Sequence, residues 1–153
     1  MDLIEGVTMQ KLTPILDERG YLQECFRSDW PMFEKFGQAY ITVAFPNVVK
    51  AWHLHKNQTD NMICISGNAK LVLCDKRKNS TTNNNLNEIY FGDRNPLLIT
   101  IPPGIWHGFK AIGNKKIMVL NVPTEVFNYS EPDEYRLPFN SEKIDYNWDI
   151  KMG

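Results

Sequence analysis

The chain has 153 residues, of which 42% are hydrophobic and 12% aromatic, as expected of a single globular domain over residues 1–153. Its formal net charge of -1 gives no electrostatic reason to bind nucleic acid or an anionic membrane. No apolar run is long enough to span a bilayer, and the N-terminus lacks a signal-peptide pattern. The widely spaced Cys25, Cys64 and Cys74 indicate reduced thiols in a cytoplasmic protein.

Short strands separated by turns dominate the pattern along the chain. Helical periodicity is scarce, and the best helical candidate is the short segment 29–36. Residues 62–75 are predicted to form a β-hairpin, because two apolar runs flank the turn Ser66-Gly67-Asn68. The polar stretch 75–85 is expected to be an exposed loop. The other expected strands are residues 41–45, 48–55, 88–91, 97–101, 108–112 and 117–122.

Many short strands with Gly, Pro and Asn turns between them favour an all-β sandwich or small barrel. The double-stranded β-helix jelly roll, the fold of the cupins, fits best, with short helices at its periphery. The aromatic C-terminal tail is irregular and is expected to wrap over the outside of this body.

The three histidines of the chain fall in two strand segments. His53 and His55 are two residues apart on an expected strand, so their side chains point to the same side of the sheet. Asp60 follows at a spacing from which its carboxylate could fold back toward them. His107 lies in a second segment, Pro-Pro-Gly-Ile-Trp-His, at 102–107. Imidazoles on apolar strands are costly to leave unpaired, so the two segments predict a single pocket.

Three interpretations of this histidine group remain open. The first is that the histidines are core residues bonded to backbone groups. The second is a metal site, since histidines and a carboxylate suit Zn, Fe, Mn or Ni. The spacing resembles the two metal motifs of the cupins, with aspartate where the first motif usually has glutamate. In that alternative the ligands are His53, His55, Asp60 and His107.

The third interpretation is acid–base chemistry without a metal. A neutral imidazole near pH 7 can remove a proton from carbon next to a ketone, and a nearby cation can stabilise the enolate. Lys50, on the same expected strand, is the candidate cation. On a regular strand, however, Lys50 faces the same side as Trp52 and the side opposite His53, so only a bulge would bring it to the histidines.

Five ordered segments of the chain match the pattern of one family. The most specific is Ile-Pro-x-Gly-x-x-His-Gly-Phe, at residues 101–109. The others are Asp-x-Arg-Gly-x-x-x-Glu at 17–24, Val-Val-Lys-Ala-Trp-His at 48–53, a Gly…Asp-x-Arg-x-x-Ser segment at 67–80, and a C-terminal signature at 129–148. In these segments the chain resembles the dTDP-4-dehydrorhamnose 3,5-epimerase family, cupin-fold enzymes of nucleotide-sugar metabolism.

The resemblance implies roles by position. His53 falls at the catalytic base, and beside the resemblance we expect His55 or Asp60 to be its partner or second proton carrier. His107 falls at a sugar-binding histidine, and Lys50 replaces an arginine while keeping the charge. Arg19 and Glu24 fall at positions that bind the nucleotide, and from their aromatic side chains we expect Trp52 and Tyr129 to stack on base or sugar.

Two departures from the family pattern are visible. The family's proton-donating tyrosine is expected near Leu120 or Asn121, and neither residue is a phenol. The segment that carries the aspartate partner of the catalytic histidine is not found after Trp148. The paired histidines instead resemble the sugar-nucleotide 3,4-ketoisomerases, which are related cupins.

The sequence therefore predicts a cytoplasmic isomerase, an epimerase of a nucleotide-linked 4-keto-6-deoxy sugar. It would act at C3, C5 or both by proton abstraction, as a homodimer without a cofactor, in surface-polysaccharide or deoxysugar biosynthesis. The alternatives are a 3,4-ketoisomerase, a metal-dependent cupin, and a non-catalytic sugar-nucleotide-binding homologue. The nucleotide, the sugar and the carbon that is inverted are not specified by the sequence.

Overall fold

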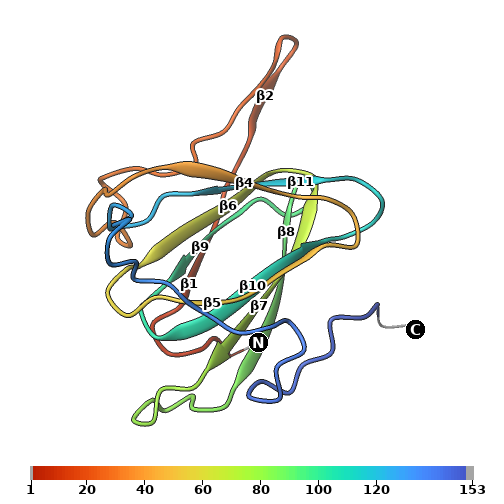
Figure 1. Ribbon diagram of the computed structural model, residues 1–153. Helices are drawn as coiled ribbons and strands as arrows, with labels where there is room; N and C mark the ends of the chain where they lie inside the picture. Colours follow the sequence, from red (N-terminus) through yellow and green to blue (C-terminus); the bar gives the residue numbers. More distant parts are fainter. Residues whose placement is uncertain (1, 151–153) are drawn as a thin grey trace.

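Two five-stranded antiparallel sheets face each other in the computed structural model, which describes residues 2–150 (Figure 1). The first sheet has the order β1 (Thr8–Lys11), β9 (Leu97–Ile101), β6 (Asp60–Ser66), β11 (Ile117–Asn121) and β4 (Tyr40–Ala44). The second has the order β12 (Tyr135–Arg136), β5 (Val49–Leu54), β10 (Ile105–Ala111), β7 (Asn68–Asp75) and β8 (Leu86–Gly92). This arrangement confirms the predicted all-β jelly-roll fold.

The core lies between the two sheets. Alternating residues such as Met62 and Cys64 on β6, and Leu71 and Leu73 on β7, point inward and are buried. Burial of each large aliphatic side chain contributes roughly 1.5–3 kcal/mol. This packing makes the sandwich a rigid frame for the side chains at its open edge.

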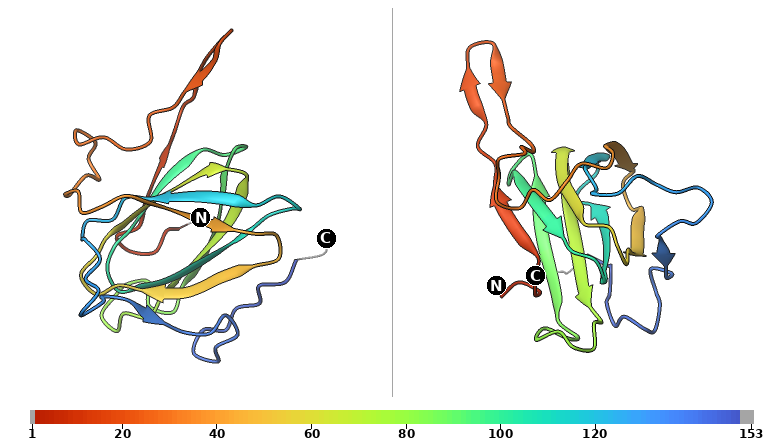
Figure 2. Two further views of the ribbon diagram at one scale, coloured as in Figure 1. Left: turned by 45° about the horizontal axis from the view of Figure 1, so that its top comes forward. Right: turned by 90° about the vertical axis from the view of Figure 1, so that its left-hand side faces the viewer.

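A third, two-stranded element projects from the sandwich. β2 (Ile15–Asp17) pairs with β3 (Gly20–Leu22) in a hairpin that stands away from the body (Figure 2). Its apolar side chains are largely exposed, with Leu16 at 78% and Leu22 at 61%. This hairpin and the short strands β1 and β12 were not predicted from the sequence.

The predicted hairpin over residues 62–75 is wrong. β6 pairs with β9 and β11 in the first sheet, whereas β7 pairs with β8 and β10 in the second. The turn at Gly67, which has a φ of 77°, carries the chain from one sheet to the other. A turn signal specifies a reversal of the chain but not which strands become neighbours. Here the apolar faces of β6 and β7 are buried against each other across the sandwich.

The expected helix at 29–36 is also not formed. This segment consists of turns and bends, and no helix is present within residues 2–150. Trp30 and Met32 pack against a small cluster around Ile63 and Leu98, so tertiary contacts hold the segment without a regular backbone. No helix in the described part of the chain could therefore cross a membrane.

The C-terminal tail lies against the outer face of the second sheet. Ile144 and Trp148 are buried there against Trp52, and the two indole rings lie 5.1 Å apart. The Trp52 side chain is thus fixed on the face of β5 that points away from the interior. Most of the other expected strands form within a few residues of their predicted bounds.

Candidate active site

A cavity of about 790 Å³ opens between the two sheets. One wall is formed by β4, β6 and β11, and the other by β5 and β10. The connection from β11 to β12 forms part of its rim. All three histidines line this cavity, together with Asp60 and Lys50. The prediction that the two histidine segments share one pocket is confirmed.

A bulge in β5 decides which side chains reach the cavity. His53 pairs with His107 and Lys50 pairs with Phe109, so three steps along β5 match two steps along β10. The extra residue breaks the alternation of the strand. Lys50 and His53 therefore both line the cavity, while Trp52 points to the opposite face. Because of the bulge, Lys50 lines the same cavity as the histidines, which a regular strand would not allow.

His53 is paired with a carboxylate from the distant end of the chain. Its Nδ1 lies 3.0 Å from Oε1 of Glu134, which also accepts a hydrogen bond of 2.7 Å from Arg136. A carboxylate accepts only, so Nδ1 carries a proton and the basic lone pair is on Nε2. Burial lowers the pKa of His53, and Glu134 partly offsets this. The imidazole is therefore neutral and able to accept a proton near pH 7.

Glu134 was missed as a partner of His53. The sequence showed it only as part of a matched C-terminal signature, and Asp60 was the favoured acid. The structure brings Glu134 to His53 across 81 residues of chain. Burial would raise the pKa of Glu134, but hydrogen bonds from Arg136 and His53 outweigh it and lower the pKa. The carboxylate is thus charged when it faces the imidazole.

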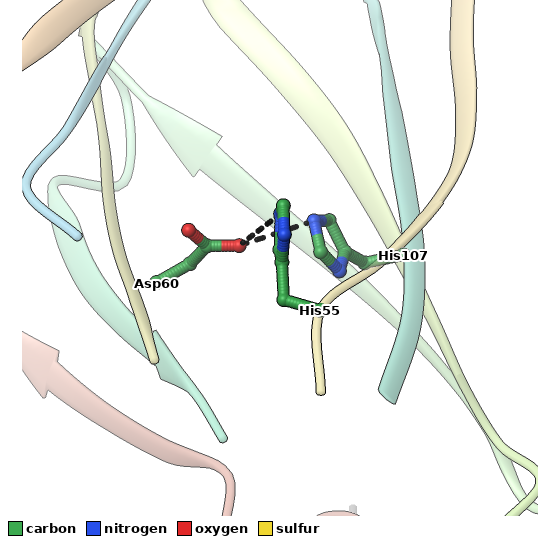
Figure 3. Close-up of side chains that lie close together, drawn as sticks. All are labelled: His55, Asp60 and His107. Atoms are coloured by element: carbon green, nitrogen blue, oxygen red, sulfur yellow. Dashed lines mark ion pairs between the residues drawn. The ribbon is translucent and has the colours of Figure 1, made fainter. Parts of the chain in front are cut away.

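Asp60 faces the other two histidines, which lie side by side (Figure 3). Its Oδ2 is 3.5 Å from Nε2 of His55 and 3.3 Å from Nε2 of His107. The other oxygen, Oδ1, accepts hydrogen bonds of 2.8 Å from the amides of Gln58 and Asn121. With only 2% of the Asp60 side chain exposed, the carboxylate is held in one orientation.

The two histidines present lone pairs to this carboxylate when they are neutral. Nδ1 of His107 lies 3.1 Å from the carbonyl of Ile105, and Nδ1 of His55 contacts the carbonyl of Asp133. Carbonyl oxygens accept only, so each Nδ1 carries the proton and each Nε2 has a lone pair. Burial lowers the pKa of His107 to about 4. When both histidines are neutral, their two Nε2 lone pairs and Oδ2 of Asp60 face one another. Such an arrangement of three acceptors is favourable only if a proton or a cation lies among them.

His55, Asp60 and His107 could hold a metal ion. Their ligand atoms lie within 4.8 Å of one another, and two histidines with one carboxylate suit several divalent metals. The hydrogen bonds from each Nδ1 to a carbonyl are of the kind that orient metal-binding histidines. His53, the fourth residue of the sequence-based metal alternative, is outside this group and is bonded to Glu134 instead.

A phenol that the sequence did not indicate also lines the cavity. Tyr40 is the first residue of β4 and lies directly opposite Asn121 in the pairing of β4 with β11. Nδ2 of Asn121 donates a hydrogen bond of 2.9 Å to the Tyr40 hydroxyl. The only available signal was the position of Tyr40 at the start of an apolar strand, which carries no functional meaning alone.

Several predicted binding residues are not brought to the cavity in a single chain. Arg19 lies at the tip of the projecting hairpin and pairs with Asp17 at 2.5 Å. Glu24 pairs with Arg27 on the surface. Trp52 is fully buried beneath the tail, so it has no free indole face for a ligand. Tyr129, in contrast, lines the cavity rim and is 89% exposed.

The fold and the cavity together define a cupin-type jelly roll with a histidine-lined pocket. A sequence model described as dTDP-4-dehydrorhamnose 3,5-epimerase matches residues 2–153. The chain therefore belongs to the dTDP-4-dehydrorhamnose 3,5-epimerase family, as the sequence resemblance predicted.

Known relatives match this chain over nearly their full length. The chain is 37% identical over 150 residues to the spore coat polysaccharide biosynthesis protein SpsL of Bacillus subtilis, covering 98% of this chain and 99% of that protein. It is also 37% identical over 154 residues to the probable low-salt glycan biosynthesis epimerase Agl13 of Haloferax volcanii, with 99% of each covered. The crystal structure of a dTDP sugar isomerase from Desulfovibrio desulfuricans G20 superposes with a TM-score of 0.90 at 31% identity, covering 95% of this chain and 92% of that one.

Proposed function

We propose that this protein epimerises a nucleotide-linked 4-keto-6-deoxy sugar at C3, C5 or both. The family supports this class of reaction, and the names of the two relatives support a place in surface-glycan biosynthesis. The observation that carries the proposal is the pairing of His53 with Glu134 on the cavity wall. The three cysteines are free thiols, which accords with the cytoplasmic location expected from the sequence.

The reaction begins at His53. Nε2 removes a proton from the carbon next to the ketone, and the electrons of that C–H bond form an enolate on the ketone oxygen. Glu134 stabilises the resulting imidazolium and fixes the ring in the productive tautomer. Lys50, brought to the same side by the bulge in β5, balances the negative charge of the enolate oxygen. His107 binds the sugar beside them.

Arg19 and Glu24 keep their proposed nucleotide-binding role only in a dimer. Both residues lie on or near the projecting hairpin, away from the cavity of their own chain. The exposed apolar side chains of that hairpin suit a contact with a second copy of the chain. We therefore propose a homodimer in which the hairpin carries Arg19 and Glu24 toward the partner's nucleotide.

Deuterium uptake from solvent tests the proposed function. The protein is incubated in heavy water with dTDP-4-keto-6-deoxyglucose, and the sugar is examined by mass spectrometry and proton NMR. We expect deuterium at C3, C5 or both, and a loss of at least about 100-fold in the rate for His53→Ala. An unchanged melting temperature of His53→Ala serves as the control for folding. No uptake by the wild-type protein, or normal uptake by His53→Ala, would contradict the proposal.

A metal-dependent reaction is the second candidate, because three lone-pair acceptors converge around Asp60. In that case the purified protein contains about one equivalent of a divalent metal, and a chelator stops deuterium uptake. His107→Ala would then lose the metal, as measured by elemental analysis. Exchange at the full rate by a metal-free protein would contradict this candidate. A proton shared among His55, Asp60 and His107 would then take the place of the metal.

A further inference from the structure

Inversion at carbon needs two groups on opposite faces of the sugar. A proton that is removed from one face must be replaced from the other, since return to the same face restores the starting configuration. His53 belongs to β5, in the second sheet. The proton donor is therefore expected on the facing wall of the cavity, which is built from β4, β6 and β11 of the first sheet.

Tyr40 is the phenol on that facing wall. It lies at the cavity end of the edge strand β4, with Thr42 two residues further along the same face. His55, the second proton carrier suggested by the sequence, follows β5 on the same wall as His53, with Nδ1 bonded to a carbonyl and Nε2 facing Asp60. It is thus placed to act on the same face of the sugar as His53.

The hydrogen bonds around Asn121 leave the Tyr40 proton available. Oδ1 of Asn121 accepts a bond of 3.0 Å from the backbone N–H of Asn61, so Nδ2 is the end that faces Tyr40. Nδ2 donates to the phenol oxygen at 2.9 Å and to Asp60 at 2.8 Å. Within residues 2–150 the hydroxyl proton of Tyr40 has no acceptor. It is free to face a ligand in the cavity.

Two further effects suit Tyr40 to donate a proton. Desolvation, together with the nearby Asp60 carboxylate, raises the pKa of Tyr40 to about 12, so the phenol stays protonated near neutral pH. Tyr40 lines the same cavity as His53 and its partner Glu134, so the phenol and the base belong to one site. When the phenol loses its proton, the amide of Asn121 stabilises the phenolate by the hydrogen bond that it already makes.

We propose that Tyr40 is the proton donor of the epimerisation, opposite His53, and that Asn121 positions its hydroxyl. This rests on the proposed function. His53 takes the proton from the carbon next to the ketone, and the C–H electrons form the enolate. Tyr40 then donates its proton to the same carbon from the other face, so that a new C–H bond forms and the ketone is restored. The proton on His53 returns to the phenolate through solvent, which leaves the protein unchanged.

Tyr40→Phe separates the two proton transfers. The variant retains the base, so it is expected to exchange the sugar proton for deuterium within about 10-fold of the wild-type rate. Inversion should fall by about 100-fold or more, since the donor is lost. Both rates are read from one sample: exchange from the mass of the sugar, and inversion from the proton NMR couplings of the product. A melting temperature close to that of the wild-type protein establishes that the variant is folded.

Tyr129→Phe is the matched control, because Tyr129 is the other tyrosine with a side chain at the cavity. Its exposed ring is expected to affect exchange and inversion by the same factor, through binding of the sugar. The proposal is overturned if Tyr40→Phe inverts the sugar at the wild-type rate, or if Tyr129→Phe shows the separation instead. Absence of exchange by the wild-type protein would overturn the proposed function and this proposal with it.

Discussion

At the scale of single residues, the group bound to Nδ1 sets the chemistry of each histidine. His53 faces the carboxylate of Glu134, whereas His107 and His55 face neutral carbonyl oxygens. A carboxylate stabilises an imidazolium more strongly than a carbonyl does. His53 is therefore the histidine whose Nδ1 partner is charged and which stands outside the group around Asp60, as the proposed role of catalytic base requires.

Glu134→Gln tests this pairing. Loss of the charge is expected to slow deuterium uptake by about 100-fold. It should also move the acid limb of the pH profile of kcat/KM to lower pH, because Glu134 raises the pKa of His53 against the effect of burial. Glu131→Gln, an exposed carboxylate at the same rim, is the control. An acid limb at the wild-type position in Glu134→Gln would exclude Glu134 as the partner.

Lys50→Met tests the stabilisation of the enolate. Removal of the positive charge of Lys50 from the cavity is expected to lower kcat for exchange by about 100-fold. Lys50→Arg keeps the charge, as in the family pattern, and should restore most of the rate. Steady-state kinetics with both variants makes the comparison. Equal rates for the methionine and arginine variants would show that charge at this position is unimportant.

At the scale of elements, the connection between β7 and β8 is fixed by a buried carboxylate. Asp75 is fully buried and accepts hydrogen bonds from Arg77 at 2.9 Å, from Ser80 at 2.6 Å and from Thr82 at 2.8 Å. The backbone N–H of Thr81 donates to Glu5 at 2.8 Å, which ties the loop to the N-terminal segment. The Asp-x-Arg-x-x-Ser pattern that supported the resemblance is thus structural, and it lies outside the cavity.

Asp75→Asn is expected to lower the free energy of unfolding by about 3 kcal/mol, because Arg77 then loses a buried ionic partner. Burial alone would raise the pKa of Asp75, but the bonds from Arg77 and Ser80 hold it well below its usual range. The contribution is therefore present at neutral pH and lost as the pH falls below about 4. Urea unfolding at neutral and acidic pH measures it. The exposed Asp145→Asn should change stability by less than about 0.5 kcal/mol, and a similar value for Asp75→Asn would contradict the prediction.

At the scale of the whole molecule, the projecting hairpin is the feature that a single chain does not explain. Leu16 pairs with Tyr21 and Ile15 with Leu22, so both faces of the hairpin present apolar side chains. A two-stranded ribbon without a core is at best marginally stable in water. Contact with a second chain would stabilise it, which is the reason to expect the proposed homodimer.

A double variant, Leu16→Asp with Leu22→Asp, tests the dimer. The wild-type protein is expected to have the mass of two chains in analytical ultracentrifugation at micromolar concentration, and the variant the mass of one, since charges would be placed on the apolar contact. Ile112→Asp, on the turn after β10, should remain dimeric. A wild-type protein with the mass of one chain would refute the homodimer.

The features that could be predicted from the sequence are those that depend on near neighbours. The alternation of β5 placed His53 and His55 on one side, turn residues separated most of the strands, and the spacing of Asp60 and of the Pro-x-Gly-x-x-His segment predicted one pocket. Each of these follows from local backbone geometry, which a few adjacent residues specify.

In contrast, which distant groups meet depends on the tertiary structure. It separated β6 from β7, and the bulge in β5 brought Lys50 to the cavity that the histidines line. It also joined His53 to Glu134 and Tyr40 to Asn121, each pair 81 residues apart in the chain. Such contacts arise from the burial of whole sheet faces against each other, a free energy summed over many residues, and no local pattern in the sequence encodes the partner.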